Sequence, residues 1–164
     1  MSRKRENVRQ CKAIRQLIDD NKYTKALELI DAIPLEEVGS LDDLYRYAEL
    51  YEKAERMDKK KEIFYHIYHR THSRYMLNRL LRLTIRMGDM EEARELYFAY
   101  EVAGPITLDT FELRYLLAKA EGEPPERLIQ ILEELKKEEY TEEWGFLLAC
   151  LYEKTGQIDK CIQE

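Results

Sequence analysis

Residues suited to binding an anion are concentrated in one segment, from Phe64 to Gly88. The segment has no acidic residue, and it contains five arginines and three histidines: Arg70, Arg74, Arg79, Arg82, Arg86, His66, His69 and His72. An arginine guanidinium can hold a carboxylate or a phosphate through two parallel hydrogen bonds. Without these five arginines the chain has 22 basic and 33 acidic residues, so the rest of it is strongly acidic.

The histidines and the remaining polar residues indicate neither a metal site nor a catalytic one. His66, His69 and His72 are spaced three apart, which could place two imidazoles on one helical face, but zinc needs a third and usually a fourth ligand. We therefore expect packed or helix-capping histidines, with no metal and no cofactor. The chain has no nucleophile motif, phosphate loop or zinc-protease motif, so we expect no catalytic residues and no enzymatic activity.

The composition predicts an all-helical protein. Of the 164 residues 37% are charged, whereas there are only six Gly and four Pro. The only valines are Val8, Val38 and Val102, so the β-branched enrichment that marks sheets is missing. Few helix breakers and many charges are typical of long, solvated helices.

Charge and cysteine usage limit the partners and the compartment. The formal net charge of −6 opposes general binding to nucleic acids or to anionic membranes. We expect no membrane association, because no apolar stretch is long enough for a span. The three cysteines, Cys11, Cys150 and Cys161, are odd in number and widely spaced, which predicts a reduced, cytoplasmic protein.

Helical periodicity divides the chain into about ten segments that come in pairs. The turns inside the pairs are expected at Asn21, Asp58, Gly88, Gly122 and Gly156. Their intervals are 37, 30, 34 and 34 residues. A period near 34 that is filled by two helices indicates a helical-repeat solenoid.

The third pair shows a family resemblance most clearly. Gly88 is followed after five residues by Ala93 and after four more by Tyr97, and Pro105 falls where a second helix would end. In these positions the sequence resembles the tetratricopeptide repeat family. The same offsets give Ala26 and Ile30 after Asn21, and, counted from Asp58, Ile63 and Ile67. Ile63 would then stand where the family has a small residue.

The resemblance implies a right-handed α-α superhelix of about five helix-turn-helix repeats. Their approximate bounds are 6–38, 40–72, 73–106, 107–140 and 141–164. Only two helical turns follow Gly156, too few to cover the ninth helix. Since solenoids need a polar terminal cap, we expect the sequence to be a fragment of a longer chain.

In this family the first helix of each pair lines a concave groove, through residues ten, nine, six and two places before the turn. In the third pair these are Asn78, Arg79, Arg82 and Arg86. The resemblance thus implies a groove for an extended peptide with acidic side chains or a free C-terminal carboxylate.

A second interpretation of the same residues stays open. Counted from Asp58, the equivalent positions of the second pair are Ala48, Glu49, Glu52 and Arg56. Those of the fourth pair are Glu112, Leu113, Leu116 and Ala120. The arginines could therefore pair with acidic residues on adjacent helices and form a mutually neutralised, solvated face.

The sequence predicts a non-catalytic scaffold that binds a protein or a peptide in its groove. One alternative is a structural or self-assembling module, in which terminal helices of two copies stack into a homo-oligomer. Another is a regulatory domain that senses a peptide. Tyrosines interleaved with the arginines could stack on single-stranded bases, but an RNA-binding repeat array would be basic overall, unlike this chain.

Overall fold

The computed structural model describes residues 3–138, 142–157 and 160. Within these residues the chain forms nine α-helices and one 3-10 helix, and it contains no strand. The first half comprises α1 (Arg3–Asp19), α2 (Tyr23–Ala32), the 3-10 helix η1 (Leu35–Glu37), α3 (Leu41–Lys53) and α4 (Met57–Thr71). The second half comprises α5 (Arg74–Met87), α6 (Met90–Val102), α7 (Leu108–Ala120), α8 (Pro125–Glu138) and α9 (Glu142–Lys154).

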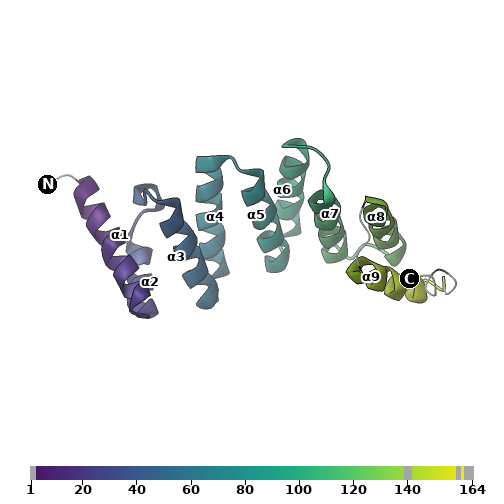
Figure 1. Ribbon diagram of the computed structural model, residues 1–164, viewed down its shortest axis with the longest axis horizontal. Helices are drawn as coiled ribbons and strands as arrows, with labels where there is room; N and C mark the ends of the chain where they lie inside the picture. The colour runs from purple at the N-terminus through teal and green to yellow at the C-terminus, as the bar shows by residue number, and fades with distance from the viewer. Residues whose placement is uncertain (1–2, 139–141, 158–159, 161–164) are drawn as a thin grey trace. The chain divides into compact units, whose positions relative to one another are not determined.

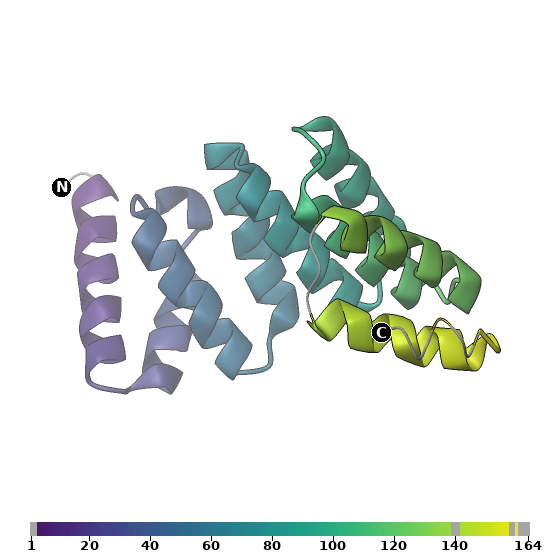
Figure 2. The same ribbon diagram turned by 45° about the vertical axis from the view of Figure 1, so that its right-hand side comes forward.

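One compact unit, Met1–Met76, contains α1 to α4. Within it α1 packs against α2, α2 against α3, and α3 against α4. Figures 1 and 2 show that the two helices of each pair run antiparallel. The core contains large apolar side chains that are at most 3% exposed, among them Ile14, Ile30, Leu44, Phe64 and Ile67. Full burial of one such side chain stabilises the fold by about 1.5–3 kcal/mol.

A second compact unit, Leu77–Glu164, contains most of α5 together with α6 to α9. Within it α6 packs against α7, α7 against α8, and α8 against α9. The last three helices share a core whose most deeply buried members are Ile131, Leu132, Leu135 and Leu148. No single helix here can bury its apolar stripe alone, so each depends on its neighbours.

The helix starts follow the capping residues in the sequence. The Ser40 hydroxyl accepts a hydrogen bond of 3.4 Å from the Asp43 N–H at the start of α3. Thr107 and Thr110 form a reciprocal capping box at the start of α7. Pro125 begins α8, where its missing N–H has no intrahelical partner to lose.

The turns inside the pairs recur with an almost constant period. The residues with positive φ at these turns are Asn21 (58°), Glu55 (58°), Gly88 (84°), Gly122 (75°) and Gly156 (77°). Their intervals are 34, 33, 34 and 34 residues. At Gly122, for example, the Gly122 N–H donates to the Lys119 carbonyl (3.1 Å) and the Glu123 N–H to the Ala118 carbonyl (3.0 Å). This pair of bonds is the Schellman motif, which satisfies carbonyls at the helix end.

The prediction of the second turn at Asp58 was wrong, because α3 ends at Lys53 and the residue with positive φ at the turn is Glu55. The Glu55 N–H donates to the Glu52 carbonyl (3.0 Å), and the Arg56 N–H donates to the Tyr51 carbonyl (2.8 Å). Asp58 lies in the first turn of α4. A Schellman motif therefore ends α3 even though Glu55 is a residue type that rarely adopts a left-handed conformation.

The corrected turn changes the residue at the position where the family has a small side chain. Counted from Glu55, that position is Lys60 and not Ile63, and the following aromatic position is Phe64 and not Ile67. Lys60 is only 6% exposed. Its ammonium lies 2.9 Å from a Glu52 carboxylate oxygen and 5.2 Å from the centre of the Phe64 ring. A buried, paired lysine thus fills a position between the helices of the second pair.

The tenth helix predicted after Gly156 falls mainly on 158–159 and 161–164, which lie outside the described residues. Among the helices that are described, none is both long and apolar enough to cross a membrane.

Candidate functional site

The four residues predicted to face the groove lie on α5, in the second unit. We call Asn78, Arg79, Arg82 and Arg86 the α5 arginine face. Asn78, Arg79 and Arg82 are half-buried, and Arg86 is exposed. The apolar residues between them, Leu77, Leu80, Leu81 and Leu83, are at most 3% exposed. Burial of this apolar stripe fixes the direction in which the polar face of α5 points.

The Arg82 guanidinium donates hydrogen bonds to two side chains of the second unit, those of Asn78 and Glu112. Its Nε donates to the Asn78 side-chain oxygen over 2.7 Å. Its Nη1 donates to a Glu112 carboxylate oxygen on α7 over 3.1 Å. The side chains of Arg82 and Glu112 are 35% and 32% exposed, so this ion pair is only partly screened by water. An ion pair between an α5 arginine and an acidic residue of an adjacent helix, which the second interpretation of the sequence allowed, is therefore present on the α7 side.

The corrected turn also changes the groove positions of the second pair. Counted from Glu55 they are Tyr45, Arg46, Glu49 and Lys53, in place of Ala48, Glu49, Glu52 and Arg56. Burial agrees with this change, because Ala48 is 2% exposed and belongs to the core. Arg46, Glu49 and Lys53 are exposed. Glu52 pairs with Lys60 inside the first unit.

The histidines of α4 contact aromatic rings and end the helix. The Tyr65 and His69 rings stack with centroids 6.2 Å apart, and Tyr68 lies edge-on to His72 at 6.1 Å. His72 adopts a left-handed conformation (φ 49°) and caps α4 through a hydrogen bond from its N–H to the Tyr68 carbonyl. Burial and the nearby Arg70 charge lower the pKa of His66. No group of three metal-binding side chains occurs within the described parts of the chain.

Arg114 on α7 is a second arginine held inside the second unit. Its Nε donates to the Tyr97 hydroxyl on α6 over 3.0 Å, and its Nη1 lies 3.5 Å from a Glu134 carboxylate oxygen on α8. The guanidinium also lies 5.3 Å from the centre of the Phe111 ring. Arg114 thus connects three consecutive helices, which makes it a structural residue.

A cavity that the sequence did not predict opens in the first unit. It has a volume of about 260 Å³, and it lies between α2, η1 and α4, with Tyr51 contributed by α3. We call it the α2–α4 pocket. Its apolar lining is Ile30, Ile33, Pro34, Leu35 and Ile63. Its polar lining is Asp31, Glu36, Tyr51, Lys59 and Glu62.

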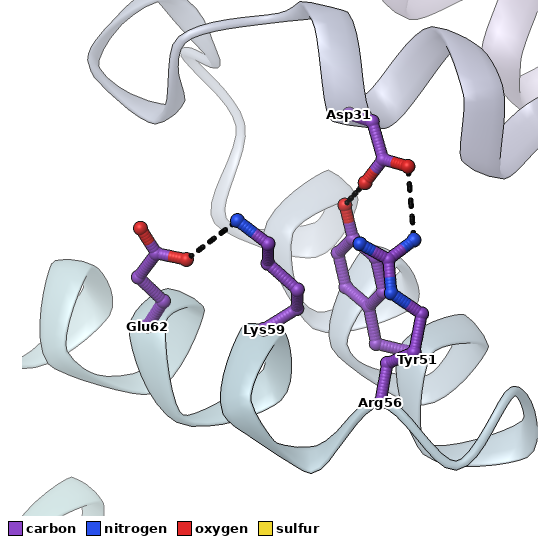
Figure 3. Close-up of polar contacts among 5 residues, drawn as sticks. All are labelled: Asp31, Tyr51, Arg56, Lys59 and Glu62. Atoms are coloured by element: carbon purple, nitrogen blue, oxygen red, sulfur yellow. Dashed lines mark hydrogen bonds and ion pairs between the residues drawn. The ribbon is translucent and has the colours of Figure 1, made fainter.

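Figure 3 shows the polar contacts on one side of the α2–α4 pocket. The Tyr51 hydroxyl donates to one Asp31 oxygen (2.5 Å), and Arg56 Nη1 donates to the other (2.9 Å). The Lys59 ammonium donates to a Glu62 carboxylate oxygen over 3.2 Å. Hydrogen bonding to Arg56, assisted by the Tyr51 hydroxyl, lowers the pKa of Asp31. Burial raises the pKa of Tyr51, so it remains a neutral donor.

No short sequence signal pointed to this pocket. Tyr51 follows Asp31 by 20 residues and Arg56 follows it by 25. Only the packing of α2, α3 and α4 brings these side chains together. The one local hint is Pro34, which ends regular helix after α2 and allows the chain to form the pocket wall.

No protein-family model and no curated protein matches the chain. TTC0263, a thermophilic TPR protein of Thermus thermophilus, is 20% identical over 96% of this chain and 87% of its own, with a TM-score of 0.58. The MamA RS-1 ArsTM double mutant is 12% identical over 99% and 91%, with a TM-score of 0.66.

A third similar structure contains the nearly identical TPR-like repeats of a putative kinesin light chain from Podosopora anserina. It is 17% identical over 99% of this chain and 93% of its own, with a TM-score of 0.56. These likenesses cover almost the whole chain, and they agree with its all-helical structure and its turn period. The predicted fold class is confirmed: the chain has the all-α, helical-repeat fold of tetratricopeptide-repeat proteins.

Proposed function

We propose that the chain is a non-catalytic scaffold that binds a protein segment on the α5 arginine face. The observation that carries the proposal is the contact between Arg82 and Glu112. A guanidinium oriented by Asn78 already holds a carboxylate there, in a partly buried setting. A charged pair of this kind is stronger than a neutral hydrogen bond. The face is therefore suited to an acidic side chain or a C-terminal carboxylate.

The corrected turn positions support the same chemistry in the first unit. The groove positions of its two pairs include Lys12, Arg15, Arg46 and Lys53, all exposed. Arg15 also forms an ion pair of 3.0 Å with Asp43. Basic residues thus recur at equivalent positions in the first three helix pairs, and in the first two pairs they outnumber the acidic groove residues Asp19 and Glu49. The proposal includes a cytoplasmic location, since widely spaced cysteines suit a reducing compartment.

The proposal is tested by selection from a random library of displayed peptides. The immobilised full chain should enrich peptides rich in Asp and Glu or ending in a free carboxylate. The Arg79→Glu, Arg82→Glu double variant should lose this enrichment while its thermal unfolding changes little. Arg127→Glu with Lys137→Glu is the matched control, because both residues are exposed on α8 and the change in net charge is the same. Enrichment of the same acidic peptides by the double variant contradicts the proposal.

Self-assembly is a second candidate function, and one observation favours it. Phe146 on α9, the last described helix, is 70% exposed. An aromatic side chain this exposed is a common anchor in protein interfaces. If copies associate through α9, sedimentation should show a mass that rises with concentration, and Phe146→Glu should abolish the rise. A monomer over the whole concentration range argues against self-assembly.

A further inference from the structure

The α2–α4 pocket is lined by none of the groove residues to which the proposed function assigns peptide binding. At about 260 Å³ it is smaller than the usual 300–1,000 Å³ of small-molecule sites. Three isoleucines in its lining, Ile30, Ile33 and Ile63, are at most 7% exposed as residues, so they form a rigid floor with little surface open to a ligand. The more accessible apolar lining is Pro34, which is exposed, and Leu35, which is half-buried. A cavity of this size and lining suits a single long side chain with an aliphatic stem.

The wall of the pocket that follows α2 is fixed by one hydrogen bond from α4 and by one within the segment itself. Arg70 Nη2 donates to the Leu35 carbonyl over 3.1 Å. The Glu37 N–H donates to the Pro34 carbonyl over 3.0 Å, and this bond closes the turn of η1. Because one bond joins this segment to α4 and the other closes the segment's own turn, the wall is preformed and needs little ordering before a ligand binds.

Charge decides which side chain fits. The lining contains three carboxylates, Asp31, Glu36 and Glu62, but only one ammonium, that of Lys59. Arg56 compensates Asp31 from outside the lining, and Lys59 is paired with a single oxygen of Glu62. Glu36 and Glu62 are both exposed at the opening, and their carboxylates can accept further hydrogen bonds. An anionic ligand would meet these two carboxylates, whereas a cation would be attracted.

We propose that the α2–α4 pocket binds an arginine side chain presented by a partner polypeptide. The aliphatic stem packs on Pro34 and Leu35, next to the buried isoleucines, and the guanidinium donates to Glu36 and Glu62 at the rim. Arginine fits better than lysine because its planar fork can bind two carboxylate oxygens at once and loses less conformational freedom per hydrogen bond. Asp31 stays bound to Tyr51 and Arg56 and keeps the inner wall in place.

The test uses the full chain with labelled isoleucine methyl groups and three capped tripeptides of sequence Gly-X-Gly. With X as arginine, we expect saturable shifts in the methyl signals of Ile30, Ile33 and Ile63. With X as norleucine, which keeps the stem without the charge, the apparent affinity should be at least about fivefold weaker. With X as glutamate, these methyl signals should not move.

Variants of the two rim carboxylates distinguish a loss of binding from a loss of folded structure. Glu36→Gln with Glu62→Gln should weaken arginine-peptide binding by about fivefold and leave the spectrum of the free chain otherwise unchanged. Glu142→Gln with Glu143→Gln, both exposed on α9, is the matched control and should have no effect. Equal binding of the arginine and norleucine peptides, stronger binding of the glutamate peptide, or no methyl shift at saturating arginine peptide each overturns the proposal. Since the α5 arginine face is not used, this result is independent of the proposed function.

Discussion

Glu112 occupies the position on Arg82 that an acidic ligand would take. The bond between them is monodentate, 3.1 Å long and partly exposed, so a ligand carboxylate can displace it at modest cost. Local periodicity predicted the helices that carry Arg82 and Glu112. Counting back from the turn residues Gly88 and Gly122 placed both at groove positions. The sequence allowed a contact between them but left it open, because the contact depends on how far α5 and α7 are shifted along their axes.

Glu112→Gln should therefore strengthen binding of an acidic peptide. The neutral amide competes less well for Arg82, and one repulsive charge is removed from the site. We expect the dissociation constant of a library-selected acidic peptide to fall about threefold to tenfold, measured by fluorescence anisotropy at low salt. Glu123→Gln, exposed in the turn after α7, is the control. Weaker binding by Glu112→Gln would show that Glu112 supports the ligand and does not compete with it.

Lys60 and Glu52 should respond unequally to mutation. The Lys60 side chain is 7% exposed, whereas that of Glu52 is 42% exposed and can be hydrated if the lysine is removed. Lys60→Met keeps most of the stem volume, so we expect a free energy of unfolding within about 1 kcal/mol of the wild type. Glu52→Ala leaves a buried ammonium without this carboxylate and should cost about 2 kcal/mol. Denaturant titration of both single variants and the double variant measures the difference, and equal losses contradict it.

Asp31 should make stability depend on pH in the acid range. Its pKa in the folded chain lies below the usual value of 3.8, chiefly through the hydrogen bond from Arg56. Its stabilising contribution is thus complete above about pH 4 and is lost as the pH falls through the folded pKa. Since its side chain is 40% exposed, we expect Asp31→Asn to cost only about 1 kcal/mol at pH 7.

The difference in unfolding free energy between wild type and Asp31→Asn should shrink below pH 4. Denaturant unfolding at several pH values from neutral to acid measures it. Glu28→Gln, exposed on the same helix, serves as the control. A difference in unfolding free energy that stays constant or increases on acidification is incompatible with the Asp31 contacts described above.

The helix ends were predictable wherever the turn residue is a type that tolerates positive φ. Asn21, Gly88, Gly122 and Gly156 all lie at the turns that the sequence predicted. Glu55 does not signal a turn, because nothing in its side chain favours the left-handed region, and the surrounding Ala54 and Arg56 are compatible with helix. The packing of α3 on α4 overrides this local preference and keeps the repeat period near 34.

Glu55→Gly should stabilise the chain. Glycine adopts the left-handed conformation at the end of α3 without the cost that a Cβ atom imposes. The gain in the free energy of unfolding should be about 1 kcal/mol, after the larger entropy of glycine in the unfolded chain is included. Glu55→Ala retains the Cβ and should bring no such gain. Equal stability of the glycine and alanine variants in thermal and denaturant unfolding would disprove the assignment.

At the scale of the whole chain, composition and period were enough to predict an all-α helical-repeat fold, which the similar structures confirm. The binding surfaces were not equally predictable. The α5 arginine face follows one helix and is visible in the sequence. The α2–α4 pocket depends on contacts between residues 20 or more positions apart, and only folding reveals it. A helical repeat can thus carry different charge on different faces while its net charge stays at −6.

We propose that Arg79 and Arg82 bind an acidic segment of a partner. The direct measurement is the affinity of one library-selected acidic peptide for three versions of the full chain: the wild type, Arg79→Glu with Arg82→Glu, and the α8 control Arg127→Glu with Lys137→Glu. We predict that the α5 variant loses at least about thirtyfold in affinity, that the control loses less than about threefold, and that all three unfold at similar temperatures. Equal losses in the two variants would show that only net charge matters and would contradict a site on α5.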